Sequence, residues 1–390
     1  MEILRLYPEC KDYIWGGEKL KTKYGKRTLV TPCAESWELS FHKDGMTRLY
    51  DGTTLSERVD SFELGENAKS FPDFPMLIKL IDARERLSVQ VHPSDEYAME
   101  HEGSYGKCEA WYIVEAEPGA GIYLGFADDV TKEEYARAIS ENRLHELLNF
   151  YEVKPGECYY IPSGTIHAIA GGCLICEIQQ SSNITYRVYD WGRKDKQGNQ
   201  RELHIEKALD VTTLKKYEPN VMRGEFLCAS KYFTARRIRV SSGERQMLAD
   251  EKSFQCIICI SGEGRVGGFD AKAGESFFVP ADYGTYTLMG NMEIILAEIR
   301  KYYVGIDVNG GIVSACLTDD AGRFIAKSSR GIKLDTSAES IAEMCRELLH
   351  SLNMTFDDIC DIVIDVAAED SWSLHATVKE IREKLLCERW

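Results

Sequence analysis

The stretch LSVQVHPSDEYA, residues 87–98, contains the pattern around which the rest of the chain can be understood. Its first half alternates apolar and polar residues, which is typical of a β-strand with one face toward a core. Because a strand has a period of two, Gln90 and His92 point to the same side. An amide oxygen and an imidazole nitrogen can then converge on one point, and the stretch predicts a strand that presents two metal-binding side chains.

Short strand-like runs separated by Gly, Pro, Asn and Asp fill residues 1 to about 210. Many short strands with turn signals are typical of a sandwich or barrel. One helical segment, TKEEYARAISENRLHELLNF (131–150), interrupts them. Thr131 is its candidate N-cap, and Glu134 stands at the capping-box position three residues on. The main strand candidates are FPMLIKLIDA (74–83), RLSVQVHP (86–93), EAWYIVEA (109–116), CYYIPSG (158–164) and CLICEIQQ (173–180).

A second strand-rich region runs from about residue 226 to 299. Its GESFFVP (274–280) echoes GECYYIP (156–162), which indicates an internal duplication. The region contains no histidine, so a second metal site of the same kind is not expected. We therefore predict a mainly β chain with a metal-binding first domain over residues 1–215 and a smaller, metal-free β-domain over 216–300.

From Lys301 onward the pattern changes. Three strands with turns at 309–311 and 319–322 precede an amphipathic helix at 337–352. A strand at 359–367 and a last helix ending at Trp390 follow. This βββαβα order predicts a small α/β module over residues 301–390.

Two further side chains can complete a metal site with Gln90 and His92. Glu109 opens a predicted strand, and His167 stands just beyond the turn Pro162–Gly164. Two imidazoles, a carboxylate and an amide suit a borderline or hard divalent ion such as zinc. From spacing alone, ordinary polar residues at strand ends are an equal alternative. Trp111 and Tyr112 can line a pocket beside Glu109 or belong to the core.

Six segments, in this order along the chain, carry a specific resemblance: IWGG (14–17), ESWELSFH (35–42), LIKLIDARERLSVQVHPSDEYA (77–98), GKCEAWYIVEAEPGA (106–120), YIPSGTIHAIAGG (160–172) and EIQQSSNITYRVYDWGR (177–193). Together they resemble the type I mannose-6-phosphate isomerases, in their shorter bacterial form, over about residues 1–300. The resemblance implies a cupin-type β-barrel or jelly roll, a second cupin-like domain, and a zinc-dependent aldose-ketose isomerase that interconverts mannose 6-phosphate and fructose 6-phosphate. It also implies that Gln90, His92, Glu109 and His167 bind one zinc ion per chain, or another divalent ion, and that Arg187 and Lys79 are pocket residues.

The chemistry explains these residue types. Moving a carbonyl between C1 and C2 requires removal of a proton beside the carbonyl, and the enediolate that develops needs stabilisation. A general base must carry the proton, and Glu177 and a metal-bound hydroxide are the candidates. Arg187 and Lys79 can supply positive charge to the phosphate or the enediolate. The alternatives are a surface lysine at residue 79 and a structural ion pair of Arg187 with Asp190.

Residues 304–324, VGIDVNGGIVSACLTDDAGRF, resemble the first phosphate-binding segment of the ROK sugar kinases and repressors, which have an actin-like ATPase fold. Asp307 matches the family, but Ile312 follows the glycines where a hydroxyl residue is usual. The chain ends before the catalytic and second-lobe residues that such kinases need. We therefore expect a partial module without kinase activity, which acts in homo-oligomerisation or docking through an exposed sheet edge or has no function.

Composition narrows the classes of partner. The 390 residues include 47 basic and 63 acidic ones, and the formal charge of -16 disfavours nucleic acid and anionic membranes. Neither a signal peptide nor a membrane-spanning run is evident. Thirteen cysteines without compact disulfide spacing favour the cytoplasm. The CxxC pairs Cys173/Cys176 and Cys256/Cys259 fall in strands, where residues three apart face opposite sides, so we expect core packing rather than a shared zinc.

Two other functions compete with the isomerase. One is a sugar-phosphate-binding regulatory protein in which the pocket senses a ligand and the C-terminal module signals. The other is a bifunctional isomerase with a kinase-like module. An open metal site beside a basic pocket favours the enzyme, because binding alone does not need an open coordination position.

Overall fold

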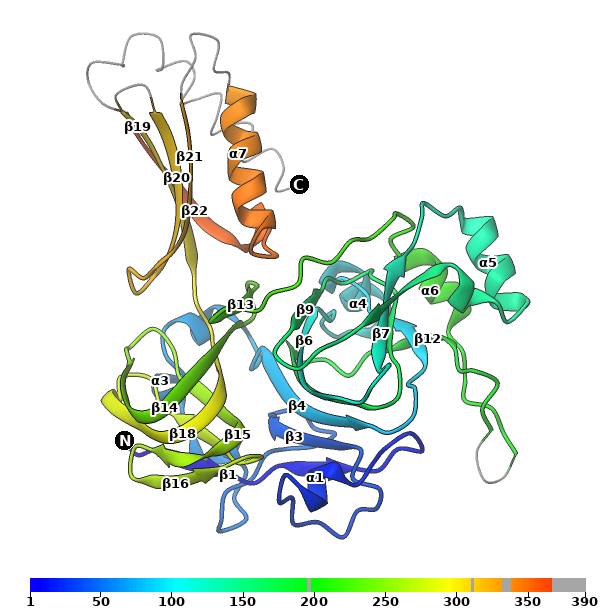
Figure 1. Ribbon diagram of the computed structural model, residues 1–390, viewed down its shortest axis with the longest axis horizontal. Coiled ribbons are helices and arrows are strands. Elements are labelled where there is room, and N and C mark those ends of the chain that lie inside the picture. The colour runs from blue at the N-terminus through cyan, green and yellow to red at the C-terminus, as the bar shows by residue number, and fades with distance from the viewer. Residues whose placement is uncertain (195–197, 310–311, 332–337, 367–390) are drawn as a thin grey trace.

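The computed structural model describes residues 1–194, 198–309, 312–331 and 338–366 (Figure 1). Its described strands form four sheets, which confirms the mainly β prediction. Two of the sheets build the first domain, the third builds the second domain, and the fourth belongs to the C-terminal module, which projects from the rest of the molecule in Figure 1.

The first domain contains two antiparallel sheets. One has the order β2 (Glu9–Lys11), β3 (Glu35–Leu39), β4 (Met76–Ala83), β11 (Cys173–Gln180), β6 (Glu109–Ala116) and β9 (Cys158–Ile161). The other has the order β12 (Tyr186–Tyr189), β5 (Val89–Val91), β10 (His167–Ile169), β7 (Gly121–Phe126) and β8 (Leu148–Glu152). Buried side chains from both sheets form one cluster, which includes Ile81, Trp111, Ile122 and Ile169. The sheets therefore face each other across a shared interior.

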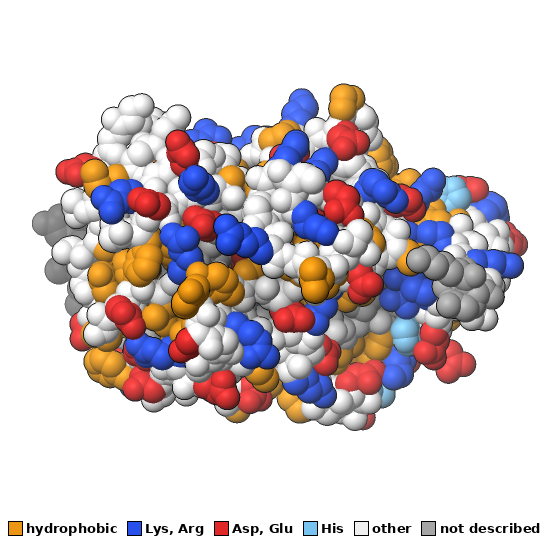
Figure 2. Space-filling model, turned by 90° about the horizontal axis from the view of Figure 1, so that it is seen from below, with side chains coloured by type: hydrophobic (Ala, Val, Ile, Leu, Met, Phe, Trp, Pro, Cys, Tyr) orange, Lys and Arg blue, Asp and Glu red, His pale blue; other side chains and the backbone are white. Residues whose placement is uncertain are grey.

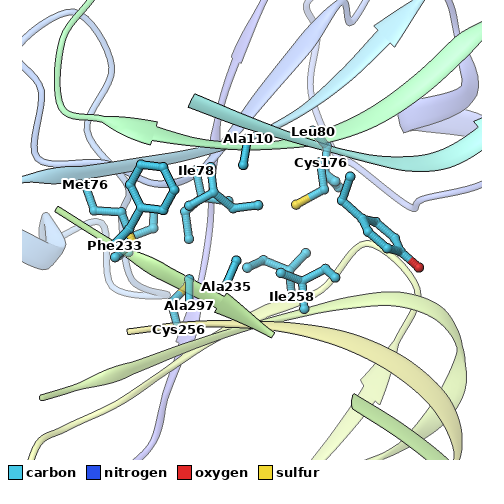
Figure 3. Close-up of a cluster of buried hydrophobic side chains, with 14 of the residues drawn as sticks. Met76, Ile78, Leu80, Ala110, Cys176, Phe233, Ala235, Cys256, Ile258 and Ala297 are labelled. Atoms are coloured by element: carbon cyan, nitrogen blue, oxygen red, sulfur yellow. The ribbon is translucent and has the colours of Figure 1, made fainter. Parts of the chain in front are cut away.

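Strand β4 is buried along its whole length because each of its faces meets a different core. Met76, Ile78 and Leu80 pack against the second domain, as Figure 3 shows. Lys79 and Ile81 alternate with them and face the interior of the first domain. The period of two thus places a charged side chain, Lys79, in the interior between the two sheets.

The helical segment is shorter than its sequence predicts. Helix α5 (Lys132–Ser140) begins with the expected capping box between Thr131 and Glu134. It ends at Ser140 because Asn142 adopts a left-handed conformation, with φ of 57°. The short helix η2 (Leu144–Glu146) follows, and the chain then enters β8, where Leu148 pairs with Phe126 of β7. The last residues of the predicted helix therefore form a strand.

The second domain is one antiparallel sheet in which the chain's first strand takes part. Its order is β1 (Leu4–Leu6), β17 (Ser276–Val279), β15 (Gln255–Val266), β18 (Gly284–Glu298), β14 (Thr234–Ala249) and β13 (Phe226–Ala229), and β16 (Phe269–Lys272) pairs with β15. The echo between GECYYIP and GESFFVP has a structural counterpart, because Gly156 and Gly274 both have a φ near 90° before β9 and β17. The two cysteines of each CxxC pair belong to different core clusters, which confirms their expected packing.

The C-terminal module has the order β21 (Phe324–Gly331), β20 (Ile312–Asp319), β19 (Tyr302–Asn309) and β22 (Ile359–Val366). Helix α7 (Ala338–His350) connects β21 to β22, which runs parallel to β19. These elements confirm the predicted βββαβ part. The glycines at 310–311 and the predicted last helix lie outside the described residues. No helix in the described ranges is long and apolar enough to cross a membrane.

The remaining helices connect strands of the two β-domains. They are α1 (Lys19–Thr22), α2 (Leu55–Arg58), α3 (Ser61–Leu64), η1 (Asn67–Ser70), α4 (Asp95–Glu102) and α6 (Ile205–Val211), and η3 (Phe356–Asp358) precedes β22. Together with α5, helix α6 covers the outer face of the five-stranded sheet, where Tyr135, Ile139 and Ala208 are buried. This packing supports the strands that carry the candidate site.

Candidate metal centre and pocket

The four side chains predicted to bind metal lie together inside the first domain. Gln90 is on β5 and His92 directly follows that strand, while His167 opens β10 and pairs in register with Gln90. Glu109 opens β6 on the facing sheet. The five-stranded sheet thus contributes the nitrogen and amide groups, and the opposite sheet contributes the carboxylate.

The distances within this group are short. His92 Nε2 lies 3.6 Å from Glu109 Oε2, and His167 Nε2 lies 3.3 Å from Glu109 Oε1. Gln90 Nε2 lies 3.3 Å from His167 Nε2. Ligand atoms of His92, Glu109 and His167 all lie within 4.8 Å of one another, the only such group of His, Cys, Asp or Glu in the described part of the chain. These side chains could share one ion with little rearrangement.

Both histidines are oriented by the backbone. His92 Nδ1 lies 2.8 Å from the carbonyl oxygen of Ile184, and His167 Nδ1 lies 2.8 Å from that of Thr165. A carbonyl can only accept, so each Nδ1 carries the proton and each Nε2 keeps its lone pair. Burial lowers the pKa of His167 to about 4 and the pKa of His92 well below its usual range. Both rings are therefore neutral and ready to bind a cation through Nε2.

The site contains polar atoms that the described residues leave without a hydrogen bond. His92 Nε2 and Glu109 Oε1 are buried and have no hydrogen-bond partner among those residues. Burial, together with the charge of Glu177, raises the pKa of Glu109 to about 7, although Lys107 opposes the rise. Buried polar groups are normally satisfied, and a divalent cation would satisfy these. The donor set thus fits the metal that the sequence predicts.

A pocket of about 290 Å³ adjoins the metal-ligating group. Gln90, Lys79, Glu177 and Arg187 line it, so the pocket brings together the predicted catalytic residues and one predicted metal ligand. Trp111 also lines it, whereas Tyr112 is buried in the core between the domains. Residues that the sequence did not single out complete the wall: Tyr13, Trp15, Glu35, Ile81, Leu87, Ser88, Lys107, Ile169, Asn183, Thr185 and Arg201.

Lys79 and Glu177 form a buried pair across β4 and β11, where they stand directly opposite each other. Lys79 Nζ lies 3.2 Å from Glu177 Oε1 and 3.9 Å from Glu35 Oε2. Burial alone would lower the pKa of Lys79, but Glu35 and Glu177 raise it. Burial alone would raise the pKa of Glu177, but Lys107 and Lys79 together lower it to about 2. Lys79 is thus a buried cation, and the surface alternative for it is wrong.

Lys107 is the most important pocket residue that the sequence did not single out. Its Nζ lies 2.8 Å from Glu109 Oε2 and 3.8 Å from Glu177 Oε1, and its side chain is buried. It stands two residues before Glu109, just ahead of β6, and in an extended chain side chains two residues apart lie on one face. That spacing was the available signal. Two buried lysines therefore face two buried carboxylates, Glu109 and Glu177, around the pocket.

Arg187 lies at the rim of the metal group on β12, paired in register with Gln90. Its Nε donates to Ser88 Oγ at 3.2 Å, and its Nη1 donates to the carbonyl oxygen of Glu202 at 3.0 Å. Asp190 instead pairs with Arg193 and Arg201, so the alternative ion pair with Arg187 does not form. Among the described residues no carboxylate lies within ion-pair distance of Arg187, which leaves its charge available to an anion in the pocket.

Comparisons with known proteins agree on one family. Residues 3–120 match the description "Phosphomannose isomerase type I, catalytic domain", and residues 223–299 match "Mannose-6-phosphate isomerase, cupin domain". The probable mannose-6-phosphate isomerase GmuF of Bacillus subtilis is 36% identical over 313 residues, which cover 76% of this chain and 98% of the relative. The mannose-6-phosphate isomerase of Streptococcus mutans is 35% identical over 317 residues, which cover 77% of this chain and 99% of the relative.

Solved structures give the same result. The mannose 6-phosphate isomerase from Bacillus subtilis superposes with a TM-score of 0.67 at 33% identity, covering 76% of this chain and 99% of that one. A putative mannosephosphate isomerase from Archaeoglobus fulgidus superposes with a TM-score of 0.64 at 25% identity, covering 76% and 96%. The relatives are thus matched over nearly their whole length, and part of this chain lies outside the match.

Proposed function

The chain belongs to the family of type I mannose-6-phosphate isomerases, and from this premise we propose that it interconverts mannose 6-phosphate and fructose 6-phosphate. The observation that carries the proposal is the convergence of His92, Glu109 and His167 beside a pocket that contains buried lysines and Arg187. A protein that only senses a sugar phosphate needs a basic pocket but no cluster of unsatisfied metal-ligating atoms, so the geometry favours the enzyme.

Gln90, His92, Glu109 and His167 would hold one zinc ion per chain. Imidazole, carboxylate and amide groups are ligands that zinc accepts, and room for substrate at an open position is typical of catalytic sites. When bound there, zinc would supply Lewis-acid stabilisation of negative charge on the sugar oxygens. Turning the Gln90 amide would direct its oxygen, rather than its nitrogen, toward the site.

The chain's own residues prepare the proton transfer between C1 and C2. The reaction passes through an enediol or enediolate, on which negative charge develops. Lys79 and Lys107 are buried, so their positive charges act through a medium that screens them less than water does. Arg187 at the rim supplies a planar guanidinium, the group that best matches the geometry of a phosphate. Trp111 and Leu87 add apolar surface to a pocket whose lining is otherwise mostly polar.

Glu177 has a different role in this scheme from that of a general base. With its pKa lowered to about 2, it is a poor proton acceptor near neutral pH. Trp111 Nε1 donates to its Oε2 at 2.8 Å, and Lys79 neutralises its other oxygen. We assign Glu177 to holding the two lysines in place, as a positioning residue.

The deciding experiment is an assay of fructose 6-phosphate formation from mannose 6-phosphate by purified protein. We expect turnover in metal-replete protein, its loss after chelation and its return with zinc. His92→Ala should abolish it, whereas His101→Ala, which changes an exposed histidine outside the pocket, should not. A folded, metal-loaded protein without turnover would refute the isomerase and favour the sugar-phosphate sensor.

The C-terminal module does not take part in this chemistry. All the proposed ligands and pocket residues lie before residue 202, whereas the module begins at β19. We propose that it is a partial ROK-like domain that associates with a second copy of the chain through a sheet edge, since β21 and β22 are terminal in the order of the described strands. ATP binding by the full chain would instead support the kinase-like alternative.

We place the protein in the cytoplasm, with a small sugar phosphate as its partner. Every described cysteine has a free thiol, which fits a reducing compartment. Figure 2 shows acidic and basic side chains interspersed over one face of the molecule. Such mixing, with a formal charge of -16, gives no support for binding to nucleic acid or an anionic membrane.

A further inference from the structure

The turn after β12 has an unusual backbone. Trp191 has a φ of 58°, and Gly192 follows with a φ of 67°. Glycine adopts this left-handed region easily, but a bulky aromatic residue is strained there. Strain of this kind persists only where surrounding contacts hold it, and it is concentrated at functional sites. The contacts of Trp191 therefore indicate what the turn is for.

The turn is tied to the loop between β4 and β5. Trp191 Nε1 donates to the carbonyl oxygen of Leu87 at 2.6 Å. Arg193 Nη1 donates to the carbonyl oxygen of Arg86, also at 2.6 Å. The guanidinium of Arg86 in turn lies 4.4 Å from the centre of the Trp191 ring. Two consecutive carbonyl groups of the loop are thus held by one strained turn.

The same loop forms part of the sugar pocket. Leu87 and Ser88 line it, and the buried Ser88 hydroxyl accepts from Arg187 Nε at 3.2 Å. Arg187 stands four residues before Trp191. The chain from Arg187 to Trp191, the bond to Leu87, and the bond from Ser88 back to Arg187 therefore close a ring. Within it, the indole N–H is linked to the guanidinium through Leu87 and Ser88.

We propose that Trp191 is a positioning residue that aligns Arg187 through Leu87 and Ser88. The inference rests on the proposed isomerase function and on the role of Arg187 in it. Packing of Tyr189 and Tyr123 against the indole, with ring centres 4.9 and 5.5 Å away, holds the ring whether or not its N–H is bonded. The N–H itself, rather than the bulk of the ring, is the group that sets the loop.

A double-mutant cycle tests this assignment. Trp191→Phe keeps an aromatic ring but removes the N–H, and we expect kcat/KM to fall by about tenfold, mainly through a higher KM, because small misalignments of positioning groups are costly. In an Arg187→Lys background the same change should cost less than about twofold, since coupled residues are not additive. Tyr123→Phe, which leaves the ring in place and changes no bond to the loop, should match the wild type.

Each outcome separates the hypotheses. An equal loss in both backgrounds, or no loss in either, would overturn the coupling. If Trp191→Phe does not fold, Ser88→Ala removes the bond from the loop to Arg187 while keeping the indole and its N–H, and the same cycle with Arg187→Lys applies. Absence of turnover in the wild-type protein would instead refute the proposed function, whereas an active wild type with an additive cycle would refute only the role of Trp191.

Discussion

At the scale of single residues, Arg187 has the clearest assigned role. It lines the pocket, and among the described residues no carboxylate lies within ion-pair distance of its guanidinium. If it binds the phosphate, Arg187→Ala should raise KM for mannose 6-phosphate by about one to two orders of magnitude, because a charge-assisted hydrogen bond is worth roughly 1.5–3 kcal/mol. Steady-state kinetics measure this. A fall in kcat at unchanged KM would place Arg187 on the enediolate instead, and unchanged kinetics would remove it from the site.

Glu177 gives a second test at this scale. Gln at this position still accepts from Trp111 but no longer neutralises Lys79 and Lys107. We expect Glu177→Gln to lower kcat/KM by about tenfold while the acidic limb of its pH profile stays where it is in the wild type. Loss of a general base would cost about 10²- to 10⁴-fold and would remove a limb. The pH dependence of kcat/KM therefore decides between positioning and base catalysis.

At the scale of elements, helix α5 allows a measurement of how much its N-terminal capping box contributes to the stability of the protein. Its capping box closes with Glu134 N donating to Thr131 Oγ1 at 3.2 Å. Thr131→Ala should reduce the free energy of unfolding by about 1 kcal/mol. Denaturant unfolding measures the change, and Glu133→Ala, which alters a neighbouring exposed side chain, is the matched control. Equal losses of unfolding free energy for the two substitutions would show that the capping hydrogen bond of Thr131 makes no contribution of its own.

Some elements of this fold could be predicted from the sequence, and others could not. The short apolar runs MLIKLIDA and CLICEIQQ, separated from their neighbours by turn residues, were enough to predict β4 and β11, and the period of two of a strand places Lys79 and Glu177 on the interior face. The strand that replaces the last residues of the predicted helix was not predictable from helical spacing, because the pairing of Leu148 with Phe126 is a tertiary contact that overrides local preference. Glu35, Arg201 and Ser88 were missed for the same reason: three distant segments meet at the pocket only after the sheets close.

At the scale of the whole molecule, buried ion pairs join the second domain to the C-terminal module. Arg300 lies between β18 and β19, and its guanidinium contacts Asp250 at 2.9 Å, Glu298 at 2.8 Å and Asp320 at 3.5 Å. Arg323 of the module also contacts Glu298, at 2.7 Å. Removing one partner from such a buried group leaves an uncompensated charge, which costs about 3–5 kcal/mol. Buried ion pairs therefore join the module to the second domain.

This junction makes stability depend on pH in a defined direction. Burial alone would raise the pKa of Glu298, but Arg300 and Arg323 lower it from 4.5 to about 2. As the pH falls, Glu298 takes up a proton in the unfolded chain before it does so in the folded protein. The stabilisation from its ion pairs is therefore fully present above pH 4.5 and is lost as the pH falls toward 2. Thermal unfolding across this range should show a weaker pH dependence for Glu298→Gln than for the wild type. The exposed Glu251→Gln should behave as the wild type, and identical pH curves for all three proteins would contradict the assignment.

The module and the isomerase site can be separated by shortening the chain. A protein ending at Arg300 keeps every proposed ligand and pocket residue, and the relatives are matched over 98% or more of their length without the remainder of this chain. Removing the module exposes Ala229, which packs in the module's core, and leaves Glu298 without Arg323. We therefore expect turnover close to that of the full chain but a lower unfolding midpoint.

If β21 or β22 pairs with a second copy, sedimentation should show a dimer for the full chain and a monomer for the shortened one. Equal association states would instead assign any self-association to the β-domains, and lost turnover in a folded fragment would mean that the module supports the site through the Arg300 junction.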